Sequence, residues 1–441
     1  MNFEKHFVLE LFARTWVRDS HGLYDYESIQ TKNLNAFLAD NVIIARKKHD
    51  IKTIRSVEEL KDLEMLLKVK YENYDKYILE NPVGVNMQPT EKNITDLSNK
   101  LWYVLRSNET NQTNPVQIIT NTNDDYYLRK NDIIKLGRVK YALNEIHIAE
   151  RVNTEEVNDI LDPHGYNINK ININTPPVFD FIFQAKTTEG EEKNGEVLCK
   201  ICYGDSNDKE NPLVHLCQCS GGIRFAHYQC IKKWMETKLN IKENEKKTVK
   251  SYNIKSFNCE ICKTPYPFRF KIEGRDDTFD LIDITLPTSN YIVLESLNQM
   301  KENCNIKSIH VITLTDDPIT IGRGHESDVR INDISVSRSH ATLKYDSTTG
   351  KLLLKDLKSK FGTLVLLKRP IEIKPSKIHL QIGRTYIEAK LMNIEEFERL
   401  KKEKMEKLAR EMKENSSKNN VDMDLDVNEK KEDDDDNMKI D

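Results

Sequence analysis

Seven of the eight cysteines lie between residues 199 and 262, and with one histidine they form four close pairs. The pairs are Cys199–Cys202, Cys217–Cys219, His227–Cys230 and Cys259–Cys262. A two-residue gap lets a tight backbone knuckle aim two side chains at one ion, and four soft ligands in a tetrahedron suit structural zinc. Eight ligands in four pairs therefore predict two closed zinc sites. The first and third pairs can share one ion and the others the second, with pairing in sequential order as the alternative.

The rest of the sequence argues against a disulfide framework, which is the use of clustered cysteines in short secreted chains. The N-terminus carries Glu4, Lys5 and Glu10 where a signal peptide needs an apolar stretch. No run approaches the ~18 apolar residues of a membrane-spanning helix. We therefore expect a soluble cytoplasmic or nuclear protein with reduced thiols and no membrane span.

The length of 441 residues predicts two to four domains, at ~100–200 residues per domain. Residues 56–79 predict a helix, because a capping box at Ser56–Glu59 precedes an apolar stripe. Residues 421–441 hold ten acidic residues and three lysines, which predicts disorder. We expect an α+β multidomain chain with these parts: a mixed helical, α/β N-terminal region (1–97), a β-rich region (98–150), a linker (151–190), the zinc module (191–270), a β-sandwich (290–392), a charged helix (393–413) and a disordered acidic tail (414–441).

The pattern of the zinc ligands resembles the RING family, and within it the RING-CH variant with its Cys-Cys-Cys-Cys-His-Cys-Cys-Cys order. The resemblance covers about 65 residues, from Cys199 to Cys262 and the lysine after it. It implies a cross-brace with two Zn²⁺ ions. The first site would then be Cys199, Cys202, His227 and Cys230, and the second Cys217, Cys219, Cys259 and Cys262. His215 lies outside this pattern, and we expect it on the surface or supporting a ligand.

The same resemblance implies a docking surface for a ubiquitin-conjugating enzyme. Its residues would be Ile201 in the first knuckle, Trp234 on the central helix and Pro265 near the last knuckle. Lys263 occupies the position after the final cysteine, where many active ligases have arginine, and lysine lacks the bidentate fork. The alternative for Ile201 and Trp234 is packing inside the zinc module.

The segment between Cys230 and Cys259 is long, at 28 residues, and holds eight lysines and three glutamates. It is either a basic contact surface or a solvated helix extension. No recognition helix or stacking platform accompanies it, so a nucleic-acid partner is not expected.

Residues 290–392 show short apolar runs broken by turn residues, which predicts a β-sandwich. Three fragments within them, 321–324, 335–340 and 356–363, resemble the forkhead-associated (FHA) domain, which binds phosphothreonine. The resemblance implies phosphate binding by Arg323 and Ser337, with Arg338 and Lys360 on the same face. It also implies structural roles for Gly322, His340 and Gly362. Phe361 replaces the asparagine of the usual motif.

Residues 136–139, Leu-Gly-Arg-Val, are similar to residues 381–384, Gln-Ile-Gly-Arg. Two interpretations of residues 98–150 remain open: a plain β-hairpin, or a second, degenerate FHA-like unit. The function expected from the whole is a RING-type E3 ubiquitin ligase that acts without a covalent intermediate. Its partners would be a ubiquitin-conjugating enzyme and a phosphothreonine-containing protein. The alternative is a non-catalytic scaffold that binds zinc and phosphopeptides.

Overall fold

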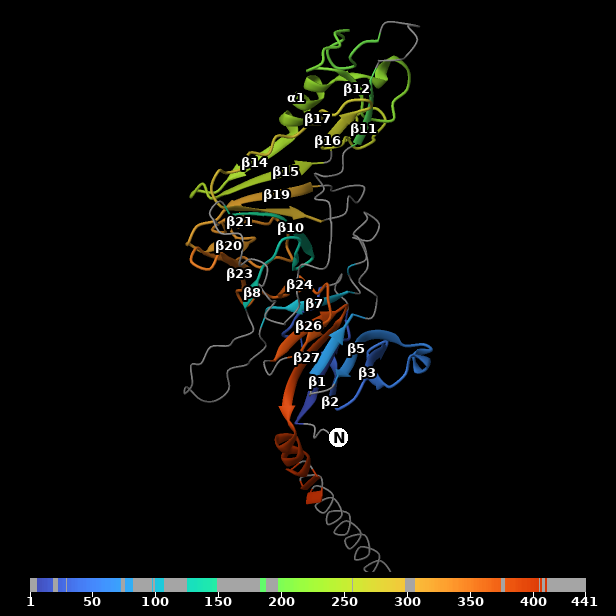
Figure 1. Ribbon diagram of the computed structural model, residues 1–441, viewed down its shortest axis with the longest axis vertical. Helices are drawn as coiled ribbons and strands as arrows, with labels where there is room; N and C mark the ends of the chain where they lie inside the picture. Colours follow the sequence, from blue (N-terminus) through green and yellow to red (C-terminus); the bar gives the residue numbers. More distant parts are fainter. Residues whose placement is uncertain are drawn as a thin grey trace, which may run out of the picture.

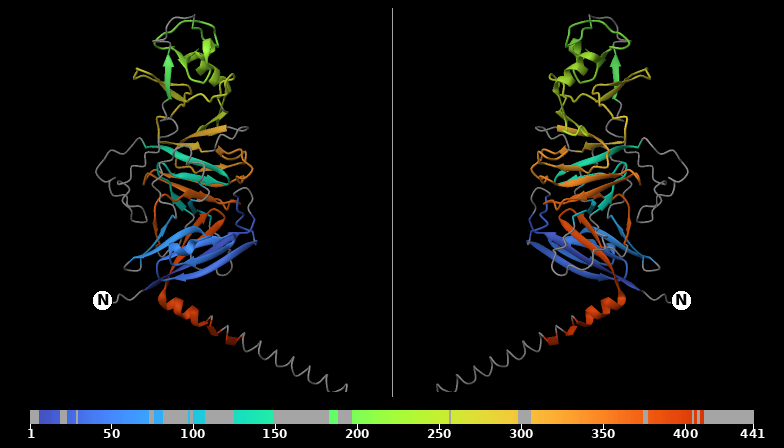
Figure 2. Two further views of the ribbon diagram at one scale, coloured as in Figure 1. Left: turned by 90° about the vertical axis from the view of Figure 1, so that its right-hand side faces the viewer. Right: turned by 90° about the vertical axis from the view of Figure 1, so that its left-hand side faces the viewer.

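The computed structural model describes residues 6–18, 23–28, 30–72, 76–81, 97, 100–106, 125–148, 183–187, 197–255, 257–297, 306–373 and 377–403, with 405, 406, 409 and 410. These residues form an elongated stack (Figures 1 and 2). The region of the zinc ligands lies at one end and β-sheets fill the middle. The helix that follows the last strand, at residues 394–403, projects from the other end.

One antiparallel sheet of twelve strands runs through the body in the order β14-β15-β19-β18-β10-β9-β24-β7-β26-β27-β1-β2. The bounds of its strands are β1 (Phe7–Trp16), β2 (Thr31–Leu38), β7 (Leu101–Val104), β9 (Ile133–Leu136), β10 (Val139–His147), β14 (Leu239–Glu243), β15 (Val249–Lys255), β18 (Tyr291–Ser296), β19 (Ile306–Thr313), β24 (Thr363–Leu366), β26 (Ile378–Ile382) and β27 (Thr385–Asn393).

Two sheets of five strands share a buried core with the long sheet, in the orders β4-β3-β5-β6-β25 and β21-β20-β22-β23-β8. Their bounds are β3 (Val42–Lys47), β4 (Asp50–Ile54), β5 (Glu64–Glu72), β6 (Lys76–Glu80), β8 (Asp125–Tyr127), β20 (Ile319–Gly322), β21 (Val329–Arg330), β22 (Ala341–Asp346), β23 (Lys351–Asp356) and β25 (Ile371–Glu372).

The strand order shows that the body consists of two equivalent halves. Read outward from the central pair β7 and β24, the long sheet continues as β26-β27-β1-β2 on one side and β9-β10-β18-β19 on the other. The two five-stranded sheets correspond in strand order, and they differ at one edge, where β3 and β4 are antiparallel but β20 and β21 are parallel. The N-terminal half of the chain therefore builds a sandwich with the same strand order as the C-terminal half.

The two halves exchange their last three strands. Strands β8, β9 and β10 follow the N-terminal half in sequence but pair with β23, β24 and β18 of the C-terminal half. Strands β25, β26 and β27 return to pair with β6, β7 and β1. The similar segments 136–139 and 381–384 are the turns of the two exchanged hairpins, and each has a glycine with positive φ, Gly137 at +59° and Gly383 at +50°.

The zinc-ligand region lies between the two halves in sequence. It contains α1 (Tyr228–Lys238) and a five-stranded sheet in the order β13-β12-β11-β16-β17. The strands of this sheet are β11 (Phe183–Thr187), β12 (Leu213–His215), β13 (Ala226–His227), β16 (Arg269–Ile272) and β17 (Thr278–Asp280). Strand β11 falls in the segment expected to be linker.

The lysine-rich segment between Cys230 and Cys259 continues α1 as far as Lys238 and then leaves the helix. It forms the hairpin β14–β15, in which Leu239 pairs with Ile254 and Glu243 with Lys250. Strand β15 then pairs with β19 along its length, from Val249↔Ile312 to Lys255↔Ile306. The helix extension, one of the two interpretations of this segment, holds only as far as Lys238, because residues such as Ile241, Tyr252 and Ile254 favour a strand. The hairpin joins the zinc-ligand region to the long sheet.

The helix expected over residues 56–79 is wrong. The capping box at Ser56 and Glu59 is present, but it opens a single 3-10 turn, Val57–Leu60, and β5 and β6 follow. A bulge is the cause of the misleading pattern. Ile44 pairs with Leu67 and Ala45 with Met65, so Leu66 is the extra residue and both leucines are buried. Two adjacent inward leucines imitate a helical stripe.

The described residues are therefore mostly β-strand, and the α+β expectation is not supported; their helices are α1 and residues 394–403. None of the described helices is long and apolar enough to cross a bilayer. The acidic tail and most of the expected linker lie outside the described residues.

Candidate metal centres and phosphate-binding face

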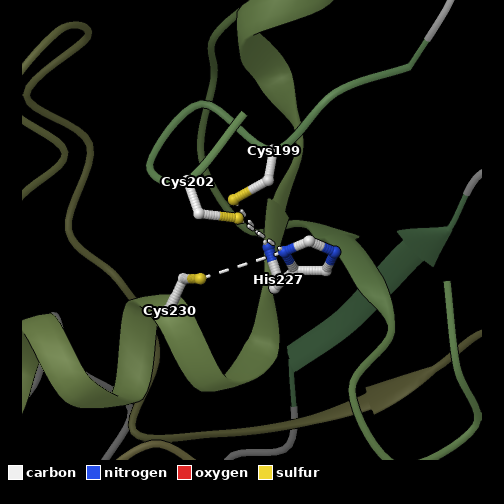
Figure 3. A group of neighbouring side chains, drawn as sticks. All are labelled: Cys199, Cys202, His227 and Cys230. Atoms are coloured by element: carbon white, nitrogen blue, oxygen red, sulfur yellow. Dashed lines mark hydrogen bonds between the residues drawn. The ribbon is translucent and has the colours of Figure 1, made fainter. Parts of the chain in front are cut away.

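The first ligand group brings together Cys199, Cys202, His227 and Cys230, whose ligand atoms lie within 4.8 Å of one another (Figure 3). His227 ends β13 and precedes α1, and Cys230 lies in the first turn of that helix. The ring nitrogen Nε2 of His227 donates to Ser206 O at 2.6 Å. This bond leaves Nδ1 facing Cys202 Sγ at 3.2 Å and Cys230 Sγ at 3.8 Å, as a metal ligand requires.

The second group brings together Cys217, Cys219, Cys259 and Cys262, again with ligand atoms within 4.8 Å. Lys200 Nζ lies 3.3 Å from Cys217 Sγ and 3.7 Å from Cys259 Sγ. Burial would lower the pKa of Lys200, but its bond to Cys217 and the nearby thiols hold that pKa above its usual value. A cation beside thiolate sulfurs stabilises the deprotonated ligands that zinc needs.

The two Cys-x-Ile-Cys segments fold as matching knuckles. Tyr203 N–H donates to Cys199 O at 2.8 Å, and Lys263 N–H to Cys259 O at 2.9 Å. Both donors have φ near +60°. The eight residues fit two closed tetrahedral zinc sites, because each group supplies the four ligand atoms that a structural zinc ion takes. His215 joins neither group, and its Nε2 bonds to Cys219 O at 3.0 Å.

The residues expected at the docking surface lie on the knuckles and on α1. Ile201 is 43% exposed, and Lys263 and Pro265 are also exposed. Trp234 is half-buried: its ring meets Tyr266 edge-on at 5.8 Å and carries Lys238 Nζ at 3.9 Å from its centroid. Lys263 Nζ donates to Glu260 O at 2.8 Å, so its side chain folds back onto its own knuckle.

The sequence reasoning above did not include Ile261 in this surface. It occupies the same position in the second knuckle as Ile201 in the first, and it is 56% exposed. The signal was present, because both knuckles read Cys-x-Ile-Cys. The zinc knuckles hold both isoleucine side chains in solvent, where they cannot pack into the protein core. Exposed apolar side chains of this kind are typical of a surface that contacts another protein.

In the C-terminal half, the loops after β20, before β22 and after β23 meet at one edge. Arg323 N–H donates to Ser337 O at 2.9 Å, and Arg323 Nε donates to Val336 O at 3.1 Å. Lys360 N–H donates to Ser337 Oγ at 3.1 Å. Arg323, Arg338 and Lys360 are exposed, and Ser337 is half-buried between them. This arrangement offers guanidinium, ammonium and hydroxyl groups to one anion.

Buried bonds hold these loops in place. His340 Nδ1 accepts from Ser337 N–H at 3.0 Å, which leaves Nε2 to donate to Gly362 O at 3.2 Å. Burial lowers the pKa of His340, in agreement with a neutral ring that both accepts and donates. A Cβ on Gly322 would lie 2.0 Å from Arg338 O, so only glycine fits there.

Residues distant in sequence also border this face, and sequence reasoning missed them. Lys360 Nζ pairs with Asp25 Oδ2 at 3.3 Å. A Cβ on Gly362 would lie 3.0 Å from the Tyr26 ring. Both partners come from the N-terminal half. No local pattern marks them, because the exchange of strands is what brings that half to this edge.

At the equivalent edge of the N-terminal half, the arginine is buried. Arg46, at the end of β3, is 6% exposed and pairs with Glu64 Oε2 at 2.5 Å. It also donates to Thr385 Oγ1 at 2.7 Å. Its guanidinium is therefore satisfied within the protein and is not presented to a ligand.

Family models confirm the two modules. The RING-variant domain model matches residues 199–262 and the FHA domain model matches residues 319–383. The chain therefore contains a RING-variant domain and, C-terminal to it, an FHA domain.

The chain is similar to curated proteins that are named as E3 or probable E3 ubiquitin ligases. It is 28% identical over 96 residues to "E3 ubiquitin-protein ligase MARCHF7" of Pongo abelii, covering 22% of this chain and 12% of the relative. It is 39% identical over 51 residues to "Probable E3 ubiquitin-protein ligase MARCHF10" of Homo sapiens, covering 12% and 6%. It is 30% identical over 106 residues to "ERAD-associated E3 ubiquitin-protein ligase DOA10" of Saccharomyces cerevisiae, covering 24% and 7%. The matches thus span a small part of each relative. No solved structure matches.

These relatives correct one expectation. The expectation of a soluble cytoplasmic or nuclear protein was wrong. It rested on the absence of a membrane-spanning segment, whereas the relatives include an ERAD-associated ligase. The location of this protein is not fixed by the features above.

Proposed function

We propose that this protein is a RING-type E3 ubiquitin ligase that selects its substrates through the FHA domain. The observation that carries the proposal is the pair of exposed knuckle isoleucines, Ile201 and Ile261, above two closed ligand groups. Closed zinc sites leave no coordination position for a reactant, so the zinc ions supply shape and not chemistry. The surface that they hold is then the functional part, and it would dock a ubiquitin-loaded conjugating enzyme.

Catalysis in this proposal is positioning. The conjugating enzyme carries the thioester, and the ligase forms no covalent bond to ubiquitin. Docking on the knuckles and α1 would hold the thioester near an acceptor lysine, and proximity of this kind lowers the barrier by removing the entropy of encounter. Lys263 would contact ubiquitin only after releasing the carbonyl of Glu260.

The FHA domain would supply the acceptor. A phosphothreonine placed against Arg323 and Ser337 would meet Arg338 and Lys360 on the same face. Strand β15 pairs with β19 of the sandwich, so this face and the zinc module belong to one sheet-connected body. A bound substrate would therefore lie in a restricted position relative to the docked enzyme.

The test is autoubiquitination by the zinc-loaded full chain with a panel of conjugating enzymes. Ile201→Ala and Ile261→Ala should each reduce chain formation at least tenfold. Ile241→Ala is the matched control, since Ile241 is 48% exposed on β14 and belongs to neither knuckle segment. Zinc content, measured by mass spectrometry, should be unchanged in all three variants.

A non-catalytic scaffold is the second candidate, and the folded-back Lys263 favours it. If the wild-type protein holds two zinc ions and forms no chains with any conjugating enzyme, the ligase proposal fails. Phosphopeptide binding would then be the remaining activity.

A further inference from the structure

A hollow beside the phosphate-binding face collects more positive charge than one phosphate requires. Three arginines line it, Arg323, Arg330 and Arg338, together with His325. Arg330 ends β21, which pairs with β20 so that Arg330 lies opposite Gly322, the residue before Arg323. Strand pairing therefore sets Arg330 next to Arg323 by backbone geometry, and not by chance contact of long side chains.

The three arginines have no carboxylate partner among the described residues. Arg323 Nε donates to the backbone at Val336 O. Arg330 Nη2 donates to His325 Nε2 at 3.4 Å, a neutral partner. Glu326 is the one acidic residue that lines the hollow, and its carboxylate folds over Gly324. Three guanidinium groups and one carboxylate leave the hollow with a net positive charge.

A single phosphothreonine accounts for part of this charge. Its phosphate carries about two negative charges and would be held by Arg323, Ser337 and Arg338. Lys360 lies on the same face and would add to this binding, with part of its charge offset by Asp25 at 3.3 Å. Arg330 and His325 lie beyond these groups and are left without an anion. Unpaired like charges side by side are unfavourable unless a ligand neutralises them.

We propose that the FHA hollow binds a peptide with two anionic side chains: the phosphothreonine at Arg323 and Ser337, and a second phosphate or carboxylate at Arg330 and His325. This inference rests on the proposed binding of phosphothreonine. It makes the preferred substrate one that is phosphorylated twice or that has an acidic residue near the phosphothreonine.

The test uses phosphothreonine peptide libraries and the zinc-loaded full chain. One flanking position at a time, on either side of the phosphothreonine, is fixed as phosphoserine, glutamate or serine, and binding is measured by fluorescence anisotropy. At one position the phosphoserine library should bind about tenfold more tightly than the serine library. A similar gain with glutamate would identify a carboxylate as sufficient, and a gain with phosphoserine alone would identify a second phosphate.

The variants assign the second site. Arg330→Ala should reduce the phosphoserine-to-serine ratio from about ten to about one, and Arg330→Lys should retain part of it. Lys344→Ala, which removes an exposed cation from β22 outside the hollow, should leave the ratio unchanged.

Two results would overturn the inference separately from the proposed function. If phosphothreonine libraries bind but no flanking position matters, or if Arg330→Ala leaves the ratio at ten, the second site is absent. If no phosphothreonine library binds better than its threonine counterpart, phosphothreonine recognition fails and the second site fails with it.

Discussion

The Arg138 guanidinium lies 3.0 Å from the Asp333 carboxylate, and this pair joins the turn of an exchanged hairpin to the loop that carries Ser337. Arg138 N–H also donates to Ser335 Oγ at 3.0 Å. The recognition loop of the FHA domain is thus braced by a turn from a distant part of the chain. An exposed ion pair alone contributes little, about 0–1 kcal/mol. The close fit of the turn against the loop matters more.

Gly137→Ala should therefore disturb the recognition loop. An added Cβ would lie 2.4 Å from Ser335 Oγ and 2.5 Å from Ser335 O, and Gly137 has φ of +59°. We expect a loss of about 1–3 kcal/mol in the free energy of unfolding and a several-fold loss of phosphothreonine-library binding. Gly274→Ala is the matched control, because Gly274 has φ of +83° and open space around its Cβ. Equal losses of library binding in the two variants would mean that the turn does not brace the loop.

Acid should destabilise the long sheet through His310. Burial lowers the pKa of His310 to about 4, and the ring contacts Ser251 Oγ at 2.8 Å and Tyr141 OH at 3.5 Å. In the unfolded chain the pKa of this histidine is about 6.5, so the unfolded state binds the proton at a higher pH than the folded state does. The stability that is present above pH ~6.5 is therefore lost as the pH falls toward 4. Between pH 7 and 5 the loss should be about 2 kcal/mol.

Denaturant unfolding at several pH values measures this effect. His310→Gln should flatten the dependence, whereas His325→Gln, at an exposed position, should not. A wild-type pH dependence retained in His310→Gln would assign the acid sensitivity to other groups, such as the cysteine ligands.

Removal of zinc should unfold the knuckles but not the exchanged strands. The amides of Tyr203 and Lys263 are protected by knuckle bonds, whereas β27 pairs with β1 over nine residue pairs far from the ligands. Hydrogen exchange after chelation should show rapid exchange at 199–204 and 259–264, and unchanged protection in β27. Added zinc should reverse the change. Loss of protection throughout the molecule would show that zinc supports the whole fold.

Lys263→Arg should accelerate ubiquitin transfer if the ligase proposal holds. Arginine presents a planar, bidentate fork that lysine lacks. We expect a several-fold faster discharge of ubiquitin from the conjugating enzyme, with Lys263→Ala slower than wild type. Lys209→Arg, at an exposed loop position of the same module, is the control. An unchanged rate in Lys263→Arg would place Lys263 outside the ubiquitin contact.

The zinc ligands could be predicted because the spacing within each pair determines the local backbone turn. A knuckle needs only the residues between Cys199 and Cys202 to aim both side chains at one ion. The FHA loops were predicted in another way, through the family resemblance of the segments that hold Gly322, His340 and Gly362, and the structure supplies the contacts that explain these residues. The pairing of Lys360 with Asp25 was not predictable, because it depends on which half each strand joins.

Local rules also failed where the wider sheet decides the conformation. Residues 239–255 of the lysine-rich segment form a hairpin because β15 pairs with the edge of β19. The sequence of the segment does not indicate that partner. Leu66 and Leu67 imitated a helix because one bulge turns both inward. The repeated Leu-Gly-Arg and Ile-Gly-Arg turns did signal two related hairpins, but the sequence does not state which sandwich each one completes.

The exchange of the last three strands has a consequence for biosynthesis. While the chain emerges from the ribosome, the N-terminal sandwich lacks β25, β26 and β27, which follow all the other described strands in sequence. Strand β8 and the two outer edges of the β9–β10 hairpin meanwhile lack their partners β23, β24 and β18 until residues 291–366 appear. Unpaired strand edges therefore stay exposed until residues 371–393 have been made, so we expect folding of the sandwiches to depend on chaperones.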